Sequence, residues 1–464
     1  MLITNGKIIT WEKENRILED QAIYILADKI VEIGPQGALK AKYPHVVNLD
    51  ARGQYVMPGN ICAHTHFYGA FARGMGIPGP TPKDFPEILT KLWWPLDLAL
   101  DEDAVAYSAL VMLVDAIKHG TTTLIDHHAS PNFIDGSLDV IAEAIAQSGL
   151  RGVLCYEVTD RNGESGAQAG IAENLRFLQR IREGKGLKTG QTGSLFPSAS
   201  RLSATFGLHA SLTVSDATLK ATRDSLPEGV GIHIHVAEHE IDEYDSLAKS
   251  GMRVIDRLNR FDLLGPNSIV VHAVHVDVKE MEILADTGTW VTHQPRSNMN
   301  NGVGLPQVES LLRMGIPVCI GTDGFSSTMW EEWKTVYLAH KLTNRDPQRM
   351  NGQDVIRMGV YNNAALASQF FLGERLGILA PGAYADLIFV DYQPYTPLTP
   401  GNLPWQILFG FHESMVTTTI VAGKILMNDR QILSLDEKAI AAEARELAPQ
   451  IWKRYERYIG TYKH

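Results

Sequence analysis

The sequence predicts an α/β protein: a (β/α)8 TIM barrel with a small β-sandwich domain built from both chain ends. Two observations predict this fold. Eight short apolar runs alternate with helical segments through the middle of the chain, and each run has a His, Asp or Glu at or near its C-terminal end. Both ends of the chain instead contain short strand patterns joined by tight turns. A chain of 464 residues is long enough for a barrel with an accessory domain.

The two chain ends share a strand-and-turn pattern. LITNGKIIT carries an Asn-Gly turn at residues 5–6, and AIYILADKIVEIG predicts two strands around Asp28 and Lys29. LGILAPGAYADLIFVD and TTTIVAGKILMNDRQIL follow the same pattern near the other end, where VAGKILM resembles TNGKIIT. We therefore predict that residues 1–58 and 375–435 form one composite β-sandwich domain.

The barrel is predicted over residues 59–374. The segment GSLDVIAEAIAQSG is typical of its helical connectors, with Ser137 as the predicted N-cap and Gly149 as the C-terminal stop. The eight apolar runs are PGNICAHTHF, TTTLIDHH, GVLCYEVTD, TFGLHAS, GIHIHVAE, SIVVHAVH, TWVTHQP and PVCIGTD. The C-terminal ends of barrel strands converge on one face, so their polar side chains are expected around a single cavity.

The last stretch, residues 436–464, is predicted to be an amphipathic helix. Its apolar residues recur at three-to-four spacing, which places them on one helical face. They are Ile440, Ala444, Leu447, Ile451, Tyr455 and Tyr458.

Composition and charge narrow the function classes. The formal net charge is -11 and no Lys/Arg-rich stripe occurs, so neither nucleic acid nor an anionic membrane is an expected partner. No apolar stretch approaches the ~20 residues that span a bilayer, and the N-terminus lacks signal-peptide organisation, so we expect a cytoplasmic protein. Cys62, Cys155 and Cys319 lie in apolar runs, which is typical of reduced cysteines in a core.

Candidate metal ligands stand at the ends of three predicted strands. His64 and His66 are two residues apart, so they share one strand face, and paired imidazoles suit a metal ion. His233 and His235 also share a face, and spacing leaves both open. We favour His235 because it lies nearer the strand end, with His233 as a core imidazole. Asp323 follows an apolar run, and its alternative role is that of a helix N-cap.

The order AHTHF, HVAE, VVHAVH, HQPRSN and IGTDG, closing with LGILAPGAYADLIFVD, resembles the amidohydrolase superfamily, in particular its cytosine deaminase, guanine deaminase and triazine chlorohydrolase branch. The resemblance covers nearly the whole chain. LWWPLDLALDED, LIDHHASP and YEVTDRNG are most similar to the SsnA-type aminohydrolases, a group linked with purine and selenium-associated metabolism. The pair His127 and His128 also resembles 8-oxoguanine and pterin deaminases.

The resemblance implies a mononuclear site for one divalent metal ion, with zinc as the expected ion and iron as the alternative. The implied ligands are His64, His66, His235 and Asp323. Glu238 and His272 match the proton-shuttling pair, with His275 as the rival for the second role, and Asp323 would also take a proton from the attacking water. Binuclear relatives carry a carboxylated lysine where TFGLHASLT has His209, so one metal ion is expected.

Four residues are predicted on the substrate-binding wall. They are His128, Arg161, His209 and Asn298. His209 matches a substrate-contacting position of the branch, whereas one of His127 and His128 must face away from the cavity. Trp93 and Trp94 follow a Pro/Gly-rich stretch where a lid would lie; the alternative is that they pack against the barrel rim.

The predicted function is that of a metal-dependent aminohydrolase, a deaminase of a small nitrogen heterocycle of purine- or pterin-like type. A ring-opening cyclic amidohydrolase or a ring-carbon dechlorinase would use the same residues. A non-catalytic scaffold would lack ligands, and here every ligand position is filled. The expected partners are the heterocyclic substrate and, because relatives are commonly dimers or larger, further copies of the chain in a homo-oligomer.

Overall fold

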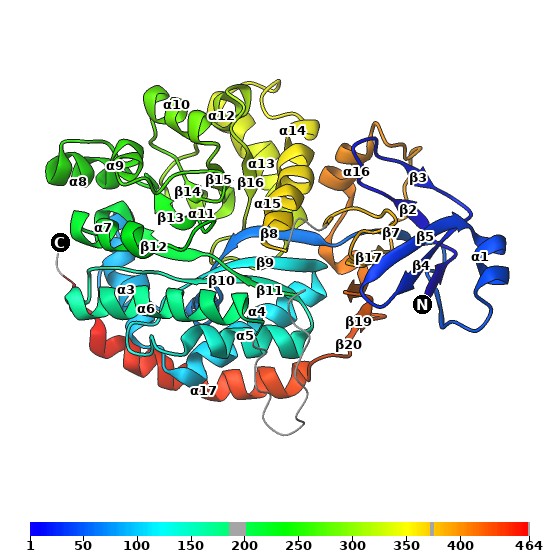
Figure 1. Ribbon diagram of the computed structural model, residues 1–464, viewed down its shortest axis with the longest axis horizontal. Helices are drawn as coiled ribbons and strands as arrows, with labels where there is room; N and C mark the ends of the chain where they lie inside the picture. The colour runs from blue at the N-terminus through cyan, green and yellow to red at the C-terminus, as the bar shows by residue number, and fades with distance from the viewer. Residues whose placement is uncertain (185–200, 372–374, 463–464) are drawn as a thin grey trace.

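The computed structural model describes residues 1–184, 201–371 and 375–462. Parallel strands lie at its centre (Figure 1). Each predicted apolar run overlaps one of them. The strands are β8 (Asn60–Thr65), β9 (Thr121–His128), β10 (Arg151–Tyr156), β12 (Phe206–Ala210), β13 (Ile232–Val236), β14 (Ile269–His272), β15 (Trp290–His293) and β16 (Val318–Ile320). Over the described ranges, no helix combines the length and the apolar character needed to cross a membrane.

The eight strands follow one another around the barrel in two parallel sheets. One sheet has the order β11-β10-β9-β8, where β11 (Leu202–Ala204) is a short addition, and the other runs from β12 to β16. A bridge between Val158 and Leu208 joins the sheets at one seam, and a bridge between Thr65 and Asp323 joins them at the other. The predicted (β/α)8 fold is confirmed, and the strand ends meet at one mouth.

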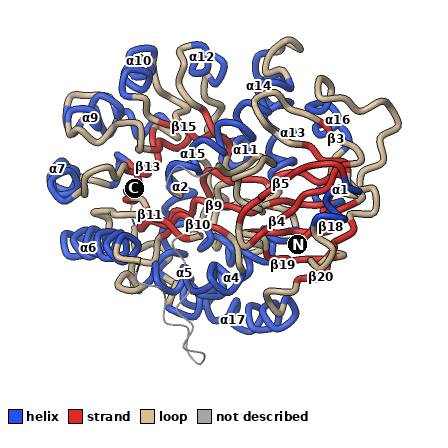
Figure 2. The backbone as a smooth tube through the Cα atoms, turned by 45° about the vertical axis from the view of Figure 1, so that its right-hand side comes forward, coloured by secondary structure: helices blue, strands red, loops and turns tan. Residues whose placement is uncertain are grey.

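Helices cover the outside of the strands (Figure 2). Their amphipathic faces pack on the apolar outer side chains of the sheet. The longer ones are α4 (Glu102–Lys118), α5 (Ser137–Ser148), α6 (Gly163–Arg182), α7 (Asp216–Ser225), α8 (Glu240–Ser250), α10 (Val278–Thr287), α13 (Met329–Asn344) and α15 (Asn363–Phe370).

The start of α5 differs from the prediction by one residue. Gly136, not Ser137, is the N-cap, and it has a left-handed backbone with φ 81°. The carboxylate of Glu173 accepts hydrogen bonds from the backbone N–H groups of Gly136 and Leu138 at 3.2 and 3.0 Å. A side chain from the next helix therefore binds backbone N–H groups at the start of α5. Gly149 ends the helix as predicted.

Strands from both chain ends build two further sheets beside the barrel (Figure 1). The first has the order β5-β4-β1-β6 and the second β20-β19-β18-β17-β7-β2-β3. Their bounds are β1 (Leu2–Thr4), β2 (Lys7–Ile9), β3 (Ile17–Leu18), β4 (Gln21–Leu26), β5 (Lys29–Pro35), β6 (Asn48–Asp50), β7 (Tyr55–Pro58), β17 (Leu387–Val390), β18 (Val416–Val421), β19 (Lys424–Asn428) and β20 (Gln431–Ile432). Ile23 and Ile30 of the first sheet share a buried core with Val56 and Phe389 of the second. The predicted barrel end at residue 374 lies outside the described chain.

The C-terminal helix α17 (Glu437–Tyr458) lies along the outside of the barrel, where Figure 1 draws it in red. It packs against α4 and α3 (Trp94–Leu98). The indole N–H of Trp452 donates to the carbonyl oxygen of Phe71 at 2.9 Å. The predicted helix over residues 436–464 overlaps this element, which ends at Tyr458; residues 459–462 are not helical, and residues 463–464 lie outside the described chain. The helix thus supports chain segments that border the barrel mouth.

Candidate active site

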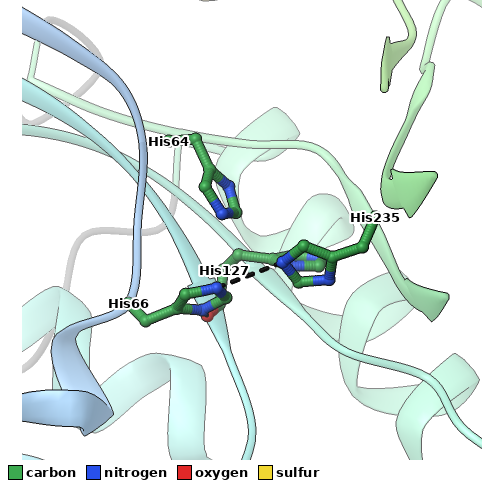
Figure 3. A group of neighbouring side chains, drawn as sticks. All are labelled: His64, His66, His127 and His235. Atoms are coloured by element: carbon green, nitrogen blue, oxygen red, sulfur yellow. Dashed lines mark hydrogen bonds between the residues drawn. The ribbon is translucent and has the colours of Figure 1, made fainter. Parts of the chain in front are cut away.

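Four imidazoles form a compact cluster at the barrel mouth (Figure 3). His64 comes from β8, His66 follows that strand directly, His127 comes from β9 and His235 from β13. Their candidate ligand atoms all lie within 4.8 Å of one another. His66 Nε2 is 3.2 Å from His235 Nε2 and 3.3 Å from Asp323 Oδ1. The alternation of side chains along β8 and the residue after it therefore turns His64 and His66 toward the same side.

Backbone carbonyls fix the orientation of these rings. His66 Nδ1 donates to the carbonyl oxygen of His127 at 2.6 Å, and His235 Nδ1 donates to that of His209 at 2.8 Å. Because a carbonyl only accepts, each Nε2 is left with a free lone pair. His64 Nε2 is buried and has no hydrogen-bond partner among the described residues. Three free imidazole nitrogens beside a carboxylate fit a zinc-type ion.

His233 lies one layer deeper than the cluster. Its Nε2 is 3.0 Å from His64 Nδ1, and its ring stacks on His127 with 4.5 Å between the ring centroids. The structure therefore brings His235 to the ligand cluster and places His233 behind His64, as a partner that orients it. Burial, and then the neighbouring imidazoles, lower the pKa of His64 well below its ordinary value, which favours the neutral, metal-binding form.

A second cluster adjoins the first. His272 Nε2 lies 3.3 Å from Glu238 Oε2 and 3.6 Å from Asp323 Oδ2. His272 and Asp323 have left-handed backbones, with φ 72° and 54°, an uncommon conformation that functional sites retain. The N-cap alternative for Asp323 is wrong, because α13 is capped at Thr328. Asn298 Oδ1 lies 3.2 Å from His272 Nδ1 and holds the ring in place.

Glu238 is placed to donate a proton. Burial, and then the charge of Asp323, raise the pKa of Glu238 well above its usual range, so the carboxyl group favours its protonated form. The side-chain amide of Asn301 donates to Glu238 Oε1 at 3.3 Å. His275, the rival to His272, instead bonds a backbone carbonyl at 3.2 Å.

A cavity of about 600 Å³ opens beside these groups. Its polar lining includes His66, Asp97, His209, His235, Glu238 and Asp323. Its apolar and aromatic lining includes Tyr68, Phe85, Leu89, Trp93, Trp94 and Leu212. An apolar wall above a few convergent polar groups suits a flat ring that is held against the cluster.

The four residues predicted on the substrate wall occupy different places. His209 lines the cavity, and its Nδ1 bonds Thr213 Oγ1 at 2.7 Å. Asn298 is fully buried behind His272 instead of on the wall. His128 bonds a serine hydroxyl at 2.8 Å and lies outside the cavity lining, so His127 is the member of the pair that reaches the ligand cluster.

Arg161, the fourth predicted residue, does not line the cavity and lies behind the lining residues Trp94 and Asp97. Its guanidinium donates to Asp97 Oδ2 at 3.0 Å and lies over the ring of Trp94, 4.8 Å from the centroid. Asp97, which the sequence prediction missed, is the member of this ion pair that lines the cavity. Asp97 lies in a helical stretch, where no strand-end pattern marks it. Glu157 was also missed, although it directly follows β10 and the strand-end rule identifies it.

Trp93 and Trp94 line the cavity and also pack against its rim. They stand at the junction of η2 (Leu89–Trp93) and α3, the helix that α17 supports. Trp93 meets Tyr68 edge-on at 6.4 Å between centroids, and Trp94 meets His209 at the same distance. The structure thus shows these two residues packed at the rim and lining the cavity, and a lid role stays a prediction.

Comparisons with known proteins agree with this geometry. A family model described as "Amidohydrolase family" matches residues 55–426. The chain is 31% identical over 464 residues to a 5-methylthioadenosine/S-adenosylhomocysteine deaminase of Pelotomaculum thermopropionicum, covering 98% of this chain and 99% of the other. It is 30% identical over 461 residues to a 5'-deoxyadenosine deaminase of Methanosarcina mazei, with the same coverage of 98% and 99%.

Solved structures share the fold. An adenosine deaminase of Xanthomonas campestris with bound zinc superposes with a TM-score of 0.81 at 24% identity, covering 97% of this chain and 98% of the other. The zinc-bound atrazine chlorohydrolase of Arthrobacter aurescens gives a TM-score of 0.77 at 19% identity, covering 97% and 100%. At these identities the likeness supports the barrel fold alone.

Proposed function

We propose, from the premise that this chain belongs to the amidohydrolase family, that it is a zinc-dependent aminohydrolase of a purine- or pterin-like heterocycle. The family and the named relatives indicate a hydrolase that acts on C–N bonds and deaminates a heterocycle, and the histidine cluster provides for a divalent metal ion. The observation that best supports the finer proposal is the contact between Glu238, His272 and Asp323 beside that cluster.

The residues divide the reaction between them. His64, His66, His235 and Asp323 would hold the ion, which when bound supplies the Lewis acidity that makes water nucleophilic at neutral pH. Asp323 accepts a proton from the attacking water. Glu238 gives its proton to the ring nitrogen next to the attacked carbon, and His272 lies close enough to both carboxylates to stabilise the charge that develops between them. The proton held on Asp323 then passes to the amino group, and the C–N bond breaks to release ammonia while the hydroxyl group of the adduct becomes a carbonyl and its proton returns to Glu238.

The cavity supports a fused ring as substrate. Its volume of about 600 Å³ exceeds what a single pyrimidine-sized ring needs, and its aromatic wall offers stacking surfaces. The named relatives act on 5-methylthioadenosine, S-adenosylhomocysteine and 5'-deoxyadenosine, so adenine derivatives are the first compounds to test.

Mass spectrometry on a compound pool tests the proposal. Zinc-loaded protein is incubated with adenine nucleosides, guanine, 8-oxoguanine, pterins, hydantoin-like rings and chlorinated triazines, and chelator-treated protein is the control. Replacement of an amine by oxygen, with one ammonia released per turnover, is the expected result. Addition of a whole water would indicate ring opening, and loss of chloride would indicate a dechlorinase. Either of these outcomes in place of deamination would overturn the proposal.

A further inference from the structure

Tyr462 lies in the short segment that follows α17, next to α3 at the barrel mouth (Figure 1). Its ring meets the ring of Trp94 edge-on, with 5.2 Å between the centroids and 71° between the ring planes. The guanidinium of Arg161 lies over the same tyrosine ring, 5.9 Å from its centroid. Trp94 lines the cavity and Tyr462 does not, so the tyrosine contacts the cavity wall from behind.

A hydrogen bond fixes this tyrosine to the start of α6. The Tyr462 hydroxyl donates to Asn162 Oδ1 at 2.6 Å. Asn162 is at the N-cap of α6, where an asparagine side chain ordinarily accepts from N–H groups of its own helix. Within this described helix it binds none of them, and its oxygen accepts from Tyr462 instead. Because Asn162 directly follows Arg161, the hydrogen bond and the cation–π contact hold the ring at two adjacent residues.

Arg161 and Trp94 connect Tyr462 to the cavity. Arg161 donates to Asp97 Oδ2 at 3.0 Å, and its guanidinium also lies over the Trp94 ring, 4.8 Å from the centroid. Trp94 and Asp97 are both lining residues of the cavity. Burial, and then the charge of Asp97, raise the pKa of Tyr462 to about 12, so its hydroxyl keeps the proton that it donates.

The Asp97 carboxylate depends on Arg161 staying in place. Asp97 is 2% exposed, and a buried carboxylate that loses its ion-pair partner is strongly destabilised. The long arginine side chain has many rotamers, and contacts with flat rings restrict them. Tyr462 supplies one of these rings and also supports the other, that of Trp94.

We infer that Tyr462 is a positioning residue of the cavity wall: through Arg161 and Trp94, it holds the wall in the shape that receives the substrate. A side chain from the segment after α17 thus affects substrate binding without lining the cavity. The inference rests on the proposed function for its kinetic readout. Its effect on the wall itself is measured without any substrate.

Hydrogen–deuterium exchange of the zinc-loaded, substrate-free protein tests the effect on the wall. Tyr462→Ala removes the ring and both of its aromatic contacts. The amide groups of residues 89–98, which form η2 and α3, are expected to exchange about tenfold faster, because the lost contacts are of that strength. Exchange in the barrel strands and the melting temperature should stay at wild-type values.

Steady-state deamination of 5'-deoxyadenosine gives the second readout. For Tyr462→Ala we expect KM to rise about tenfold while kcat stays within about twofold of wild type, since the wall binds the ring and the proton-transfer groups are untouched. Tyr462→Phe keeps the ring and loses only the hydrogen bond to Asn162, so its KM and its exchange should lie between those of wild type and the alanine variant.

Tyr43→Ala is the matched control. Tyr43 is half-buried, as Tyr462 is, but it lies beside the sheets of the β-sandwich domain. Its hydroxyl donates to Glu32 at 2.9 Å, and its ring stacks on Tyr24. The control should keep wild-type KM and wild-type exchange in residues 89–98.

Three results would overturn the inference. One is unchanged exchange of residues 89–98 in Tyr462→Ala, and another is a wild-type KM in that variant. The third is faster exchange throughout the chain with a lower melting temperature, which would make Tyr462 a general stabilising residue. If the wild type leaves 5'-deoxyadenosine unchanged, the exchange result alone decides the inference, and the compound pool decides the proposed function.

Discussion

The substitution Glu238→Gln separates proton donation from metal binding. The side chain is 12% exposed, and Gln keeps its size and an oxygen that can accept from Asn301. The nearest member of the catalytic group is His272 at 3.3 Å, and Glu238 does not belong to the histidine cluster that would hold the ion. The change therefore removes the proton while leaving the cavity and the ligands in place.

The expected loss follows from this role. A general acid contributes about 10²–10⁴-fold to a rate, equivalent to about 3–5 kcal/mol of transition-state stabilisation. We expect kcat/KM of Glu238→Gln to fall by that factor, mainly through kcat, because the shape of the cavity is unchanged. Zinc content and melting temperature should remain at wild-type values.

The rate is measured as steady-state ammonia release, and the zinc content is measured by metal analysis of the same preparations. Glu240→Gln is the matched control, because Glu240 is two residues away and exposed at the start of α8. The control should retain wild-type rates. A Glu238→Gln rate within about threefold of wild type would remove Glu238 from the mechanism, since no general acid contributes so little.

Three further substitutions test other parts of the site. Asp126 is fully buried, and burial raises its pKa to about 8. Between about pH 4 and 8, the Asp126 carboxyl group is therefore protonated in the folded protein and ionised in the unfolded chain. Wild-type stability should therefore fall as pH rises through this window, and Asp126→Asn should flatten the fall in melts from pH 5 to 9. Trp94→Ala removes a cavity wall and the ring beneath Arg161, so KM should rise about tenfold while kcat changes less, in steady-state assays. Asn298→Ala frees the ring of His272, so kcat should fall about tenfold with little change in KM, and an unchanged kcat would show that Asn298 does not orient that ring.

The barrel, and the meeting of His64, His66 and His235 at its mouth, could be predicted because they depend on local patterns. Each strand is a short apolar run, and a polar residue at its end marks where the chain leaves the sheet. The choice of His235 over His233 used only position along the strand, and the structure brings His235 to the cluster. The Ser137 cap was off by one residue because the carboxylate that satisfies the helix start, Glu173, comes from another helix.

The cavity wall was harder to predict because it depends on contacts between distant segments. Asp97 lines the cavity only because a helix held by α17 lies across the barrel mouth. Arg161 follows the third strand, but its guanidinium turns back to Asp97 and Trp94, which spacing along the chain does not reveal. Which member of the pair His127 and His128 reaches the cluster depends on the register of β9 in the closed barrel.

Asp323 lies at the point where the last strand of the barrel meets the first. The last strand joins the first through the bridge between Thr65 and Asp323, and the Thr65 hydroxyl donates to the carbonyl oxygen of Asp323 at 3.0 Å. The left-handed backbone at Asp323 then turns its carboxylate toward His66, 257 residues earlier in the chain (323 − 66). The proposed metal ligands come from β8 and the residue after it, from β13 and from the turn after β16, so they meet only when both sheets have met. We therefore expect the barrel to close before all the proposed ligands can bind an ion, and a bound ion to stabilise the closed barrel over any open form.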